Sequence, residues 1–506
     1  MGNINKIKDI KPKVGFISLT EPPRALSFAD ELNKYILIKH KEFKDFLIKN
    51  DINVVDASEL AQRPDNPKSI IGFYSSTDIQ KAIDVFNINH VEAIIIGCWH
   101  WTDPMFVVEI ARSANKPILL YGEEDPAWAA PCLITAGGAS LWDNSPNRFA
   151  QAHERVYGNK EAVLQWVRGV TVLEKLRRGK LLLWGGSYAL RMEFLQDDYP
   201  YLKSFLLGDI LLEDQYTLIK CAERVSSSRI ESFVNWLRNG GTKFNFDNLK
   251  FTPEVLNKQV ALYLGAKDRI KELGSDIIGV SVKCFNDMSD VYGVVPCFLP
   301  AFLPYIYDSE GERNQIPTVC EGDTKALISS ILLSYFAGGI PALFGDVTSI
   351  NKDYYLISNC GASSIYYSCK SCKVNEVLSN LTLEADSEGV SGAAVGYDGF
   401  EADMTVIRLL RSKGKYFMHY GLGTSIPMTN QMKGAIYFGR TNPHTAIKMN
   451  VDKDLFINAL GANHLIAIPG NYLKETEYFC RQVGIELYRI DSNEGIKSWL
   501  NRVYYL

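Results

Sequence analysis

The segment PTVCEGDTKALISSILLSYFAGGIPALFGDVTSI, Pro317–Ile350, decides the fold expected for this chain. Its pattern predicts a short buried strand, an apolar crossover helix, a Gly-Gly turn and a second strand. Glu321 follows the first strand and Asp346 ends the second, about twenty-five residues later, which suits one right-handed crossover in a parallel sheet. Ligands collect at the carboxyl edge of such a sheet, so the two carboxylates predict a divalent metal site or a general acid/base pair.

Plain structural roles for the same acids stay open at this point. Asp346 can cap a turn before Thr348, and Glu321 can favour the amino end of its helix through the helix dipole. Asp323 is expected to cap that helix.

Upstream of this segment, apolar strands alternate with amphipathic helices. Strands are predicted at residues 13–20, 52–57, 91–98 and 116–124, with a helix between each pair. Continuous apolar strands in this alternation are typical of a parallel, doubly wound sheet. The pattern restarts after the basic turn KLRRGK, which places a domain boundary near residue 178.

After residue 355 the pattern changes to short strands separated by Gly and Asn, which is typical of a barrel or a sandwich. The predicted fold class is therefore α/β, with two doubly wound, Rossmann- or flavodoxin-like domains at residues 1–177 and 178–355. A β-rich, barrel-like domain is expected at residues 356–506.

Composition narrows the class of protein. Apolar residues make up 46% and charged residues 22% of the 506 residues, as in soluble globular proteins. The net charge of −4 argues against a nucleic-acid partner. Neither an apolar run long enough for a membrane helix nor a signal-peptide core is present, so we expect a cytoplasmic protein with no membrane partner. The ten cysteines are scattered through apolar segments, as buried free thiols would be, and the pair Cys369 and Cys372 lacks the second pair of a structural zinc site.

Candidate binding residues follow the predicted strands. Trp99 and Trp101, in the tip CWHWTDP, are expected either to stack on a sugar face or to pack at a subunit interface. Arg24, in TEPPRAL, is a clamp for an anion or a hydroxyl, or a surface charge. Lys283 ends a strand and either contacts substrate or pairs with Asp287.

Two histidines need separate interpretations. His464 stands in GANHLIAIPGN before an apolar strand, where a lone histidine is a core or loop residue unless the fold brings it to the two acids. His40 lies among lysines in an amphipathic helix, where we expect a solvated side chain.

The EGD…GDVT pair, the turn NCGAS at 359–363 and GANH at 461–464 together resemble the L-fucose isomerase family, whose C-terminal signature contains Gly-Ala-Asn-His followed by a strand and a helix. The resemblance extends over nearly the whole chain. It implies that Glu321, Asp346 and His464 ligate one divalent cation, commonly manganese, with Co²⁺ or Mg²⁺ as alternatives. It also implies that Asn463 contacts the substrate.

The same resemblance implies a homohexamer with active sites at subunit contacts, to which Arg24 and Trp99 or Trp101 contribute from a neighbouring subunit. Two positions depart from the related patterns. Asn359 stands where L-arabinose isomerases carry a second histidine ligand, which favours the three-ligand fucose type. Lys283 stands where fucose isomerases place a glutamine, so hydroxyl recognition differs.

The expected function is a metal-dependent aldose–ketose isomerase that acts through a cis-enediol on an L-fucose- or D-arabinose-like sugar, with Glu321 and Asp346 as base and acid. One alternative is an isomerase of another sugar, either L-arabinose-like or anionic and sulfonated, which Lys283 with Arg24 would suit. A second alternative is a non-catalytic sugar-binding protein with two α/β lobes.

Overall fold

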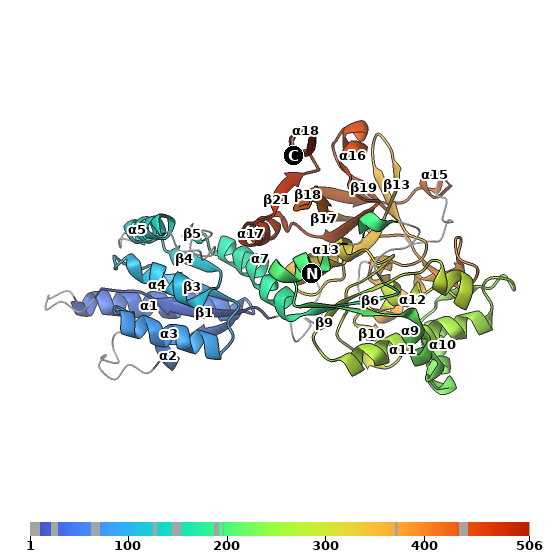
Figure 1. The fold of residues 1–506 in the computed structure, drawn as a ribbon, viewed down its shortest axis with the longest axis horizontal. Coiled ribbons are helices and arrows are strands. Elements are labelled where there is room, and N and C mark those ends of the chain that lie inside the picture. The colour runs from blue at the N-terminus through green and yellow to red at the C-terminus, as the bar shows by residue number, and fades with distance from the viewer. Residues whose placement is uncertain are drawn as a thin grey trace. The chain divides into compact units, whose positions relative to one another are not determined.

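The computed structural model describes residues 11–21, 29–61, 71–124, 129–143, 153–186, 192–195, 197–369, 373–434 and 444–504. The chain forms two compact units (Figure 1). The N-terminal unit comprises residues 8–174 and 474–484, and the large unit comprises 175–473 and 485–506. A mixed α/β chain with parallel sheets and a β-rich sheet is confirmed, whereas the three-domain division at 177 and 355 stays a prediction.

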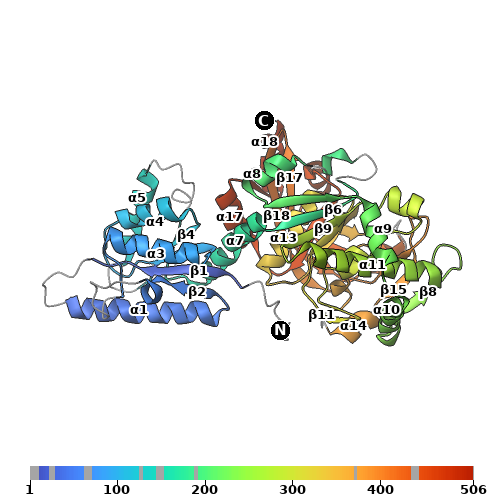
Figure 2. The same cartoon turned by 60° about the horizontal axis from the view of Figure 1, so that its bottom comes forward.

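The N-terminal unit contains a five-stranded parallel sheet with the order β2-β1-β3-β4-β5. Its strands are β1 (Lys13–Ser18), β2 (Asn53–Asp56), β3 (Ala93–Gly97), β4 (Ile118–Gly122) and β5 (Glu154–Tyr157). Its helices are α1 (Ala29–Lys49), α2 (Ala57–Leu60), α3 (Ser76–Ile88), α4 (Met105–Ala114), α5 (Ala129–Trp142), α7 (Lys160–Arg178) and α17 (Leu473–Val483). Helices α1 and α7 pack on one face and α3, α4 and α5 on the other, which buries β3 and β4 completely. Figure 2 shows α1 on the opposite side of the sheet from α3 and α4.

The large unit contains a second parallel sheet with the order β12-β9-β6-β7. Its strands are β6 (Lys180–Trp184), β7 (Asp209–Glu213), β9 (Ile277–Val282) and β12 (Thr318–Cys320). The helices of this region are η1 (Glu193–Leu195), α8 (Tyr199–Phe205), α9 (Gln215–Glu223), α10 (Ser227–Asn239), α11 (Pro253–Leu273), η2 (Asp287–Tyr292), α12 (Phe298–Phe302) and α13 (Thr324–Phe336). A hairpin of β10 (Tyr307–Asp308) and β11 (Gly311–Glu312) precedes β12.

The rest of the large unit is rich in strands. The strands are β13 (Leu343–Ile350), β14 (Tyr355–Ser358), β17 (Ala402–Ser412), β18 (Lys415–Ile426), β19 (His444–Lys448), β20 (His464–Pro469) and β21 (Glu486–Arg489). Antiparallel pairs run in a cycle from β17 through β20, β13, β14, β19 and β18 back to β17, and β21 adds to β18 in parallel. A small sheet joins β8 (Lys243–Asn245), β15 (Thr382–Ala385) and β16 (Ala393–Gly396). The remaining helices are η3 (Ile365–Ser368), α14 (Val374–Ser379), α15 (Asn430–Gly434), α16 (Lys453–Ala459) and α18 (Asn493–Tyr504).

The two strands of Pro317–Ile350 belong to different sheets, so the predicted crossover within one parallel sheet is wrong. Strand β12 is an edge strand of the parallel sheet. Strand β13 instead pairs antiparallel with β14 on one side and β20 on the other, and these two strands satisfy the backbone groups of β13. Asp346 lies inside β13 and not at its end. Helix α13 connects the two sheets and contacts β9 and β12 as well as β17 and β20, which explains why nearly all of its residues are buried.

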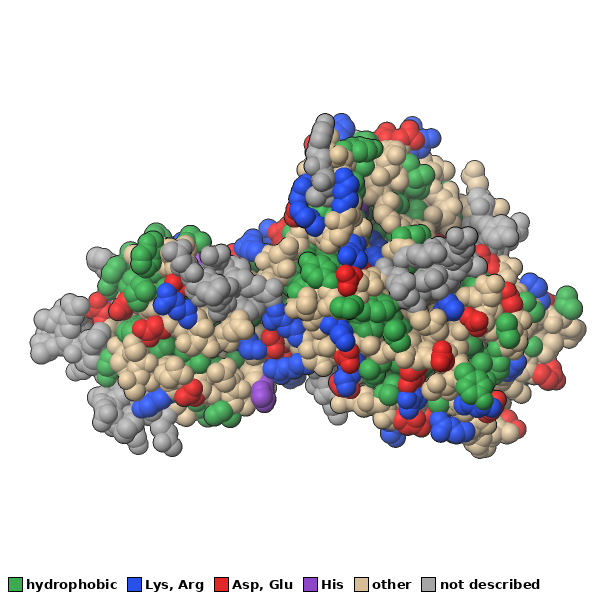
Figure 3. Space-filling model, viewed as in Figure 1, with side chains coloured by type: hydrophobic (Ala, Val, Ile, Leu, Met, Phe, Trp, Pro, Cys, Tyr) green, Lys and Arg blue, Asp and Glu red, His purple; other side chains and the backbone are tan. Residues whose placement is uncertain are grey.

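Over the described residues, no helix combines the length and the apolar character needed to cross a membrane. The face seen in Figure 3 carries acidic and basic side chains interspersed, in keeping with the small net charge of −4.

Candidate functional site

The structure brings three predicted ligands together in the large unit. Glu321 follows β12, Asp346 lies in β13, and His464 begins β20. The register pairs Asp346 directly with His464 across neighbouring antiparallel strands. His464 Nε2 lies 3.2 Å from Glu321 Oε2 and 3.5 Å from Asp346 Oδ1. Both acids therefore face one imidazole nitrogen.

The backbone at Glu321 is held in an unusual conformation. Its φ is 63°, in the left-handed region, and Gly322 follows at 72°. A side chain in this region costs roughly 1–2 kcal/mol, and such conformations cluster at functional sites. Glu321 Oε2 is buried and has no hydrogen-bond partner among the described residues, and neither has His464 Nε2. Their contact is thus close but not aligned as a hydrogen bond.

A buried ion pair orients the imidazole of His464. His464 Nδ1 lies 2.7 Å from Asp323 Oδ2, and both side chains are completely buried. The Arg408 guanidinium reaches both oxygens of the same carboxylate, at 2.9 Å from Oδ2 and 3.1 Å from Oδ1. Metal-binding histidines commonly bond a carboxylate in this way, because it fixes the ring and leaves the other nitrogen for the metal.

The charges of the site divide its acids into two kinds. Burial raises the pKa of Asp346, against the opposing effect of His464 and with the help of Glu321. Although burial opposes them, Arg408 and His464 hold the pKa of Asp323 far below its usual range. Asp323 is therefore a fixed negative charge, whereas Asp346 is able to carry a proton.

The imidazole of His464 is protonated on both nitrogens, and so positively charged, when no cation is present. Burial alone would lower the pKa of His464, but Asp346, Asp323 and Glu321 outweigh it and raise the pKa to about 10. A divalent cation would take the place of this proton. Two carboxylates and one imidazole fit a cation such as Mn²⁺, because a buried oxygen and a buried nitrogen of this set have no hydrogen-bond partner in the described part of the chain.

Asn463 joins the acids to a neighbouring cavity. Its Nδ2 donates to Asp346 Oδ1 at 2.5 Å, and its Oδ1 is buried with no partner among the described residues. A cavity of 460 Å³ is lined by Asn463 together with Phe194, Val347 and Leu460 among others. This volume lies within the range of small-molecule sites, roughly 300–1,000 Å³.

The two predicted stacking tryptophans differ in exposure. Trp99 is fully buried in the N-terminal unit, where its indole N–H donates to Ser18 Oγ at 2.8 Å. It packs edge-on against Tyr121, with ring centroids 5.7 Å apart. Trp101 is 37% exposed. Only Trp101 of the two therefore presents an indole face to solvent.

Lys283 pairs with Asp287 at 2.8 Å, the ion pair that was the structural alternative for this residue. Arg24 and Cys372 lie outside the described residues.

The expectation of a solvated His40 is wrong. His40 is 1% exposed, with Nδ1 2.8 Å from Ser18 Oγ and Nε2 2.8 Å from Asp56 Oδ2. Ser18 is itself completely buried, so this chain of hydrogen bonds braces the core of the N-terminal unit. The helix pattern contains a signal for it, because His40 falls four residues after Ile36 and three before Phe43, both buried.

Known proteins give little guidance on this chain. No family model and no curated protein matches the sequence. Among solved structures, the periplasmic binding protein of the arabinose transporter of Shewanella sp. ANA-3 is 10% identical, over 64% of this chain and 86% of its own, with a TM-score of 0.14. A galactofuranose-binding protein is 15% identical, over 65% of this chain and 99% of its own, with a TM-score of 0.13. TM-scores this low establish neither a shared fold nor a shared ligand.

Proposed function

We propose that this chain is a metal-dependent aldose–ketose isomerase of the L-fucose isomerase type, acting through a cis-enediol. The main observation behind the proposal is that the carboxylates of Glu321 and Asp346 both lie close to Nε2 of His464. The buried Asp323 supports it, because an imidazole held by a carboxylate at Nδ1 is preset as a metal ligand.

Glu321, Asp346 and His464 would hold Mn²⁺ or a similar cation, which when bound acts as a Lewis acid and stabilises the negative charge of the enediolate. Glu321 and Asp346 would exchange protons with C2 and C1 of the sugar as base and acid. Asn463 Nδ2 donates to Asp346, and its Oδ1, which has no partner among the described residues, would accept a hydrogen bond from a sugar hydroxyl.

The cavity beside Asn463 supports a neutral deoxy sugar as the substrate. Its lining includes Phe194, Val347 and Leu460, and none of its described lining residues is charged. Apolar walls suit the methyl end of a 6-deoxy sugar better than a sulfonate. An anionic sugar would need Arg24 or Lys283, and Lys283 is already paired with Asp287.

The proposal is tested by metal analysis and a substrate panel. Purified protein should lose activity with EDTA and regain it when Mn²⁺ is added back. Of L-fucose, D-arabinose, L-arabinose and a sulfonated hexose, L-fucose or D-arabinose should give the highest kcat/KM. Protein that binds a sugar but binds no Mn²⁺ and isomerises none of these sugars would identify a non-catalytic binding protein instead.

Glu321→Gln and Asp346→Asn test the acid and base roles separately. Each general acid or base contributes about 100- to 10,000-fold to the rate, so each variant should lose at least this much in kcat. Asp353→Asn is the control, because Asp353 is an exposed aspartate in the turn between β13 and β14. Near-normal turnover in either site variant would contradict the assignment.

A further inference from the structure

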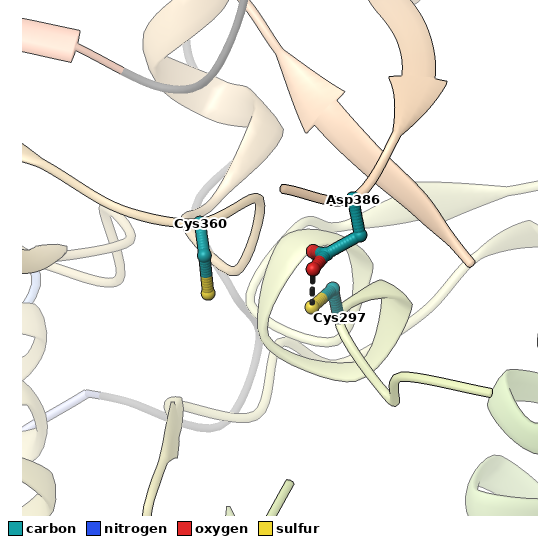
Figure 4. A group of neighbouring side chains, drawn as sticks. All are labelled: Cys297, Cys360 and Asp386. Carbon is teal, nitrogen blue, oxygen red and sulfur yellow. Dashed lines mark hydrogen bonds between the residues drawn. The ribbon is translucent and has the colours of Figure 1, made fainter. Parts of the chain in front are cut away.

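A second cluster of potential metal ligands lies in the large unit, outside the site described above. Cys297 precedes α12, Cys360 follows β14, and Asp386 follows β15, so three separate segments contribute one side chain each (Figure 4). Their potential ligand atoms all lie within 4.8 Å of one another. Cys297 and Asp386 are buried and Cys360 is partly exposed.

The spacing of these atoms suits a tetrahedral zinc ion. Zinc lies about 2.3 Å from sulfur and about 2.0–2.2 Å from a carboxylate oxygen, which places two such ligands roughly 3.5–3.8 Å apart. Cys297 Sγ lies 3.8 Å from Asp386 Oδ2. The pair could therefore share one ion with little movement of either side chain.

The Asp386 carboxylate is fixed in the orientation that such a ligand needs. Its Oδ1 accepts the backbone N–H groups of Glu388 at 3.0 Å and Gly389 at 2.6 Å. These two hydrogen bonds leave Oδ2 facing Cys297. Hydrogen bonds that orient a ligating carboxylate are a regular part of metal sites.

Without a cation, burial disfavours the ionised form of all three groups. The contact with Cys360 and burial raise the pKa of Cys297 well above its usual value, and burial raises the pKa of Asp386. Although the contact with Cys297 lowers it, burial and Asp386 bring the pKa of Cys360 to about 11. A divalent cation would reverse this balance by displacing both thiol protons into solvent.

We propose that Cys297, Cys360 and Asp386 form a second metal site for a thiophilic divalent cation, for which Zn²⁺ fits best. Two thiolates and one carboxylate supply three ligands, and a water molecule would be the fourth. Sulfur ligands select a softer ion than the oxygen and nitrogen ligands of the proposed isomerase site. The two sites are therefore separable by the metal that each prefers.

Co²⁺ is the probe that distinguishes the two sites. Thiolate-bound Co²⁺ has intense sulfur-to-metal charge-transfer absorption in the near ultraviolet, which oxygen and nitrogen ligands do not produce. Metal-free wild-type protein titrated with Co²⁺ should develop this absorption, and Zn²⁺ should abolish it by competition. The Cys297→Ser and Cys360→Ser variants should lose the band, and Asp386→Asn should bind Co²⁺ about tenfold more weakly.

Two controls keep the result specific. Cys221→Ser, at a buried cysteine of α9, should retain the band. His464→Ala should also retain it, so failure of the proposed isomerase site would leave this test intact. In wild-type protein, Zn²⁺ should slow alkylation of Cys360, a measurement that does not depend on variants folding. A wild-type protein with no charge-transfer band, a band that survives in the Cys297→Ser Cys360→Ser double variant, or a Cys297–Cys360 disulfide in place of metal uptake would overturn the proposal.

Discussion

Asp323→Asn should weaken metal binding without altering any proposed metal ligand. Asp323 Oδ1 accepts the backbone N–H of Ala326 at 2.9 Å and one Arg408 nitrogen at 3.1 Å, so the amide oxygen of asparagine would stay on that side. The amide NH₂ would then face His464 Nδ1, which must become an acceptor. The ring proton would move to Nε2 and occupy the lone pair that faces Glu321.

Two effects of different size follow from this change. Loss of a carboxylate that orients a metal-binding histidine typically reduces metal affinity about 10- to 100-fold, or about 1.4–2.7 kcal/mol. Arg408 is 1% exposed and would lose its charged partner, which costs about 3–5 kcal/mol of stability for a buried pair. The variant should therefore be both less stable and weaker in Mn²⁺ binding.

Mn²⁺ affinity is measured in a titration monitored by calorimetry or electron paramagnetic resonance, and stability is measured by thermal unfolding. Asp308→Asn is the matched control, because Asp308 is also buried and is held by Lys267 at 2.6 Å and by the Tyr263 hydroxyl at 2.7 Å. It should lose comparable stability and keep its Mn²⁺ affinity. Unchanged affinity in Asp323→Asn, or equal weakening in both variants, would refute the orienting role.

Two further predictions concern residues outside the proposed metal site. Trp99→Ala should reduce stability by about 3–5 kcal/mol in thermal unfolding, because it empties a buried core position, whereas Trp101→Ala should change stability by less than about 0.5 kcal/mol and raise KM if this indole stacks on the sugar. Burial, with a smaller effect of Arg408, lowers the pKa of His419 to about 3, so its contribution to stability is complete above pH 6.5 and is lost as the pH falls towards 3. Between pH 8 and pH 5 the free energy of unfolding should fall by about 2 kcal/mol more in the wild type than in His419→Phe. Equal decreases in the two proteins would contradict this account.

Strand and helix positions in the N-terminal unit were predictable because both faces of the sheet are covered. Strands buried on both sides are continuous apolar runs, so the composition of residues 91–98 and 116–124 was enough to predict β3 and β4. Exposure at the end of a strand was not predictable in this way. Trp99 and Trp101 stand two residues apart in a loop, and only the packing of Tyr121 and Ser18 decides that Trp99 is the buried one.

The meeting of the acids was anticipated, but for a reason that proved incorrect. Glu321 and Asp346 were expected to end two strands of one sheet, and they lie in different sheets joined by α13. A short strand carries no sign of its partner, and Gly338 and Gly339 only mark a turn, with φ of 65° and 98°. The antiparallel pairing with β20 instead sets Asp346 directly opposite His464. Register between distant strands, which depends on the whole ring of pairs, is what local patterns cannot supply.

Asp323 shows why a correct local prediction can miss most of a residue's role. It does cap α13, as expected, through the N–H of Ala326. Its other contacts come from Arg408 in β17 and His464 in β20, which the sequence separates from it by 85 and 141 positions. One signal was present, since Arg408 interrupts an apolar strand and a buried arginine requires a carboxylate. Glu321, with its positive φ, lies on the same turn as Asp323. A single loop thus carries both a proposed metal ligand and the charge that orients another ligand. Substitution of Asp323 should therefore affect metal binding more directly than sugar binding.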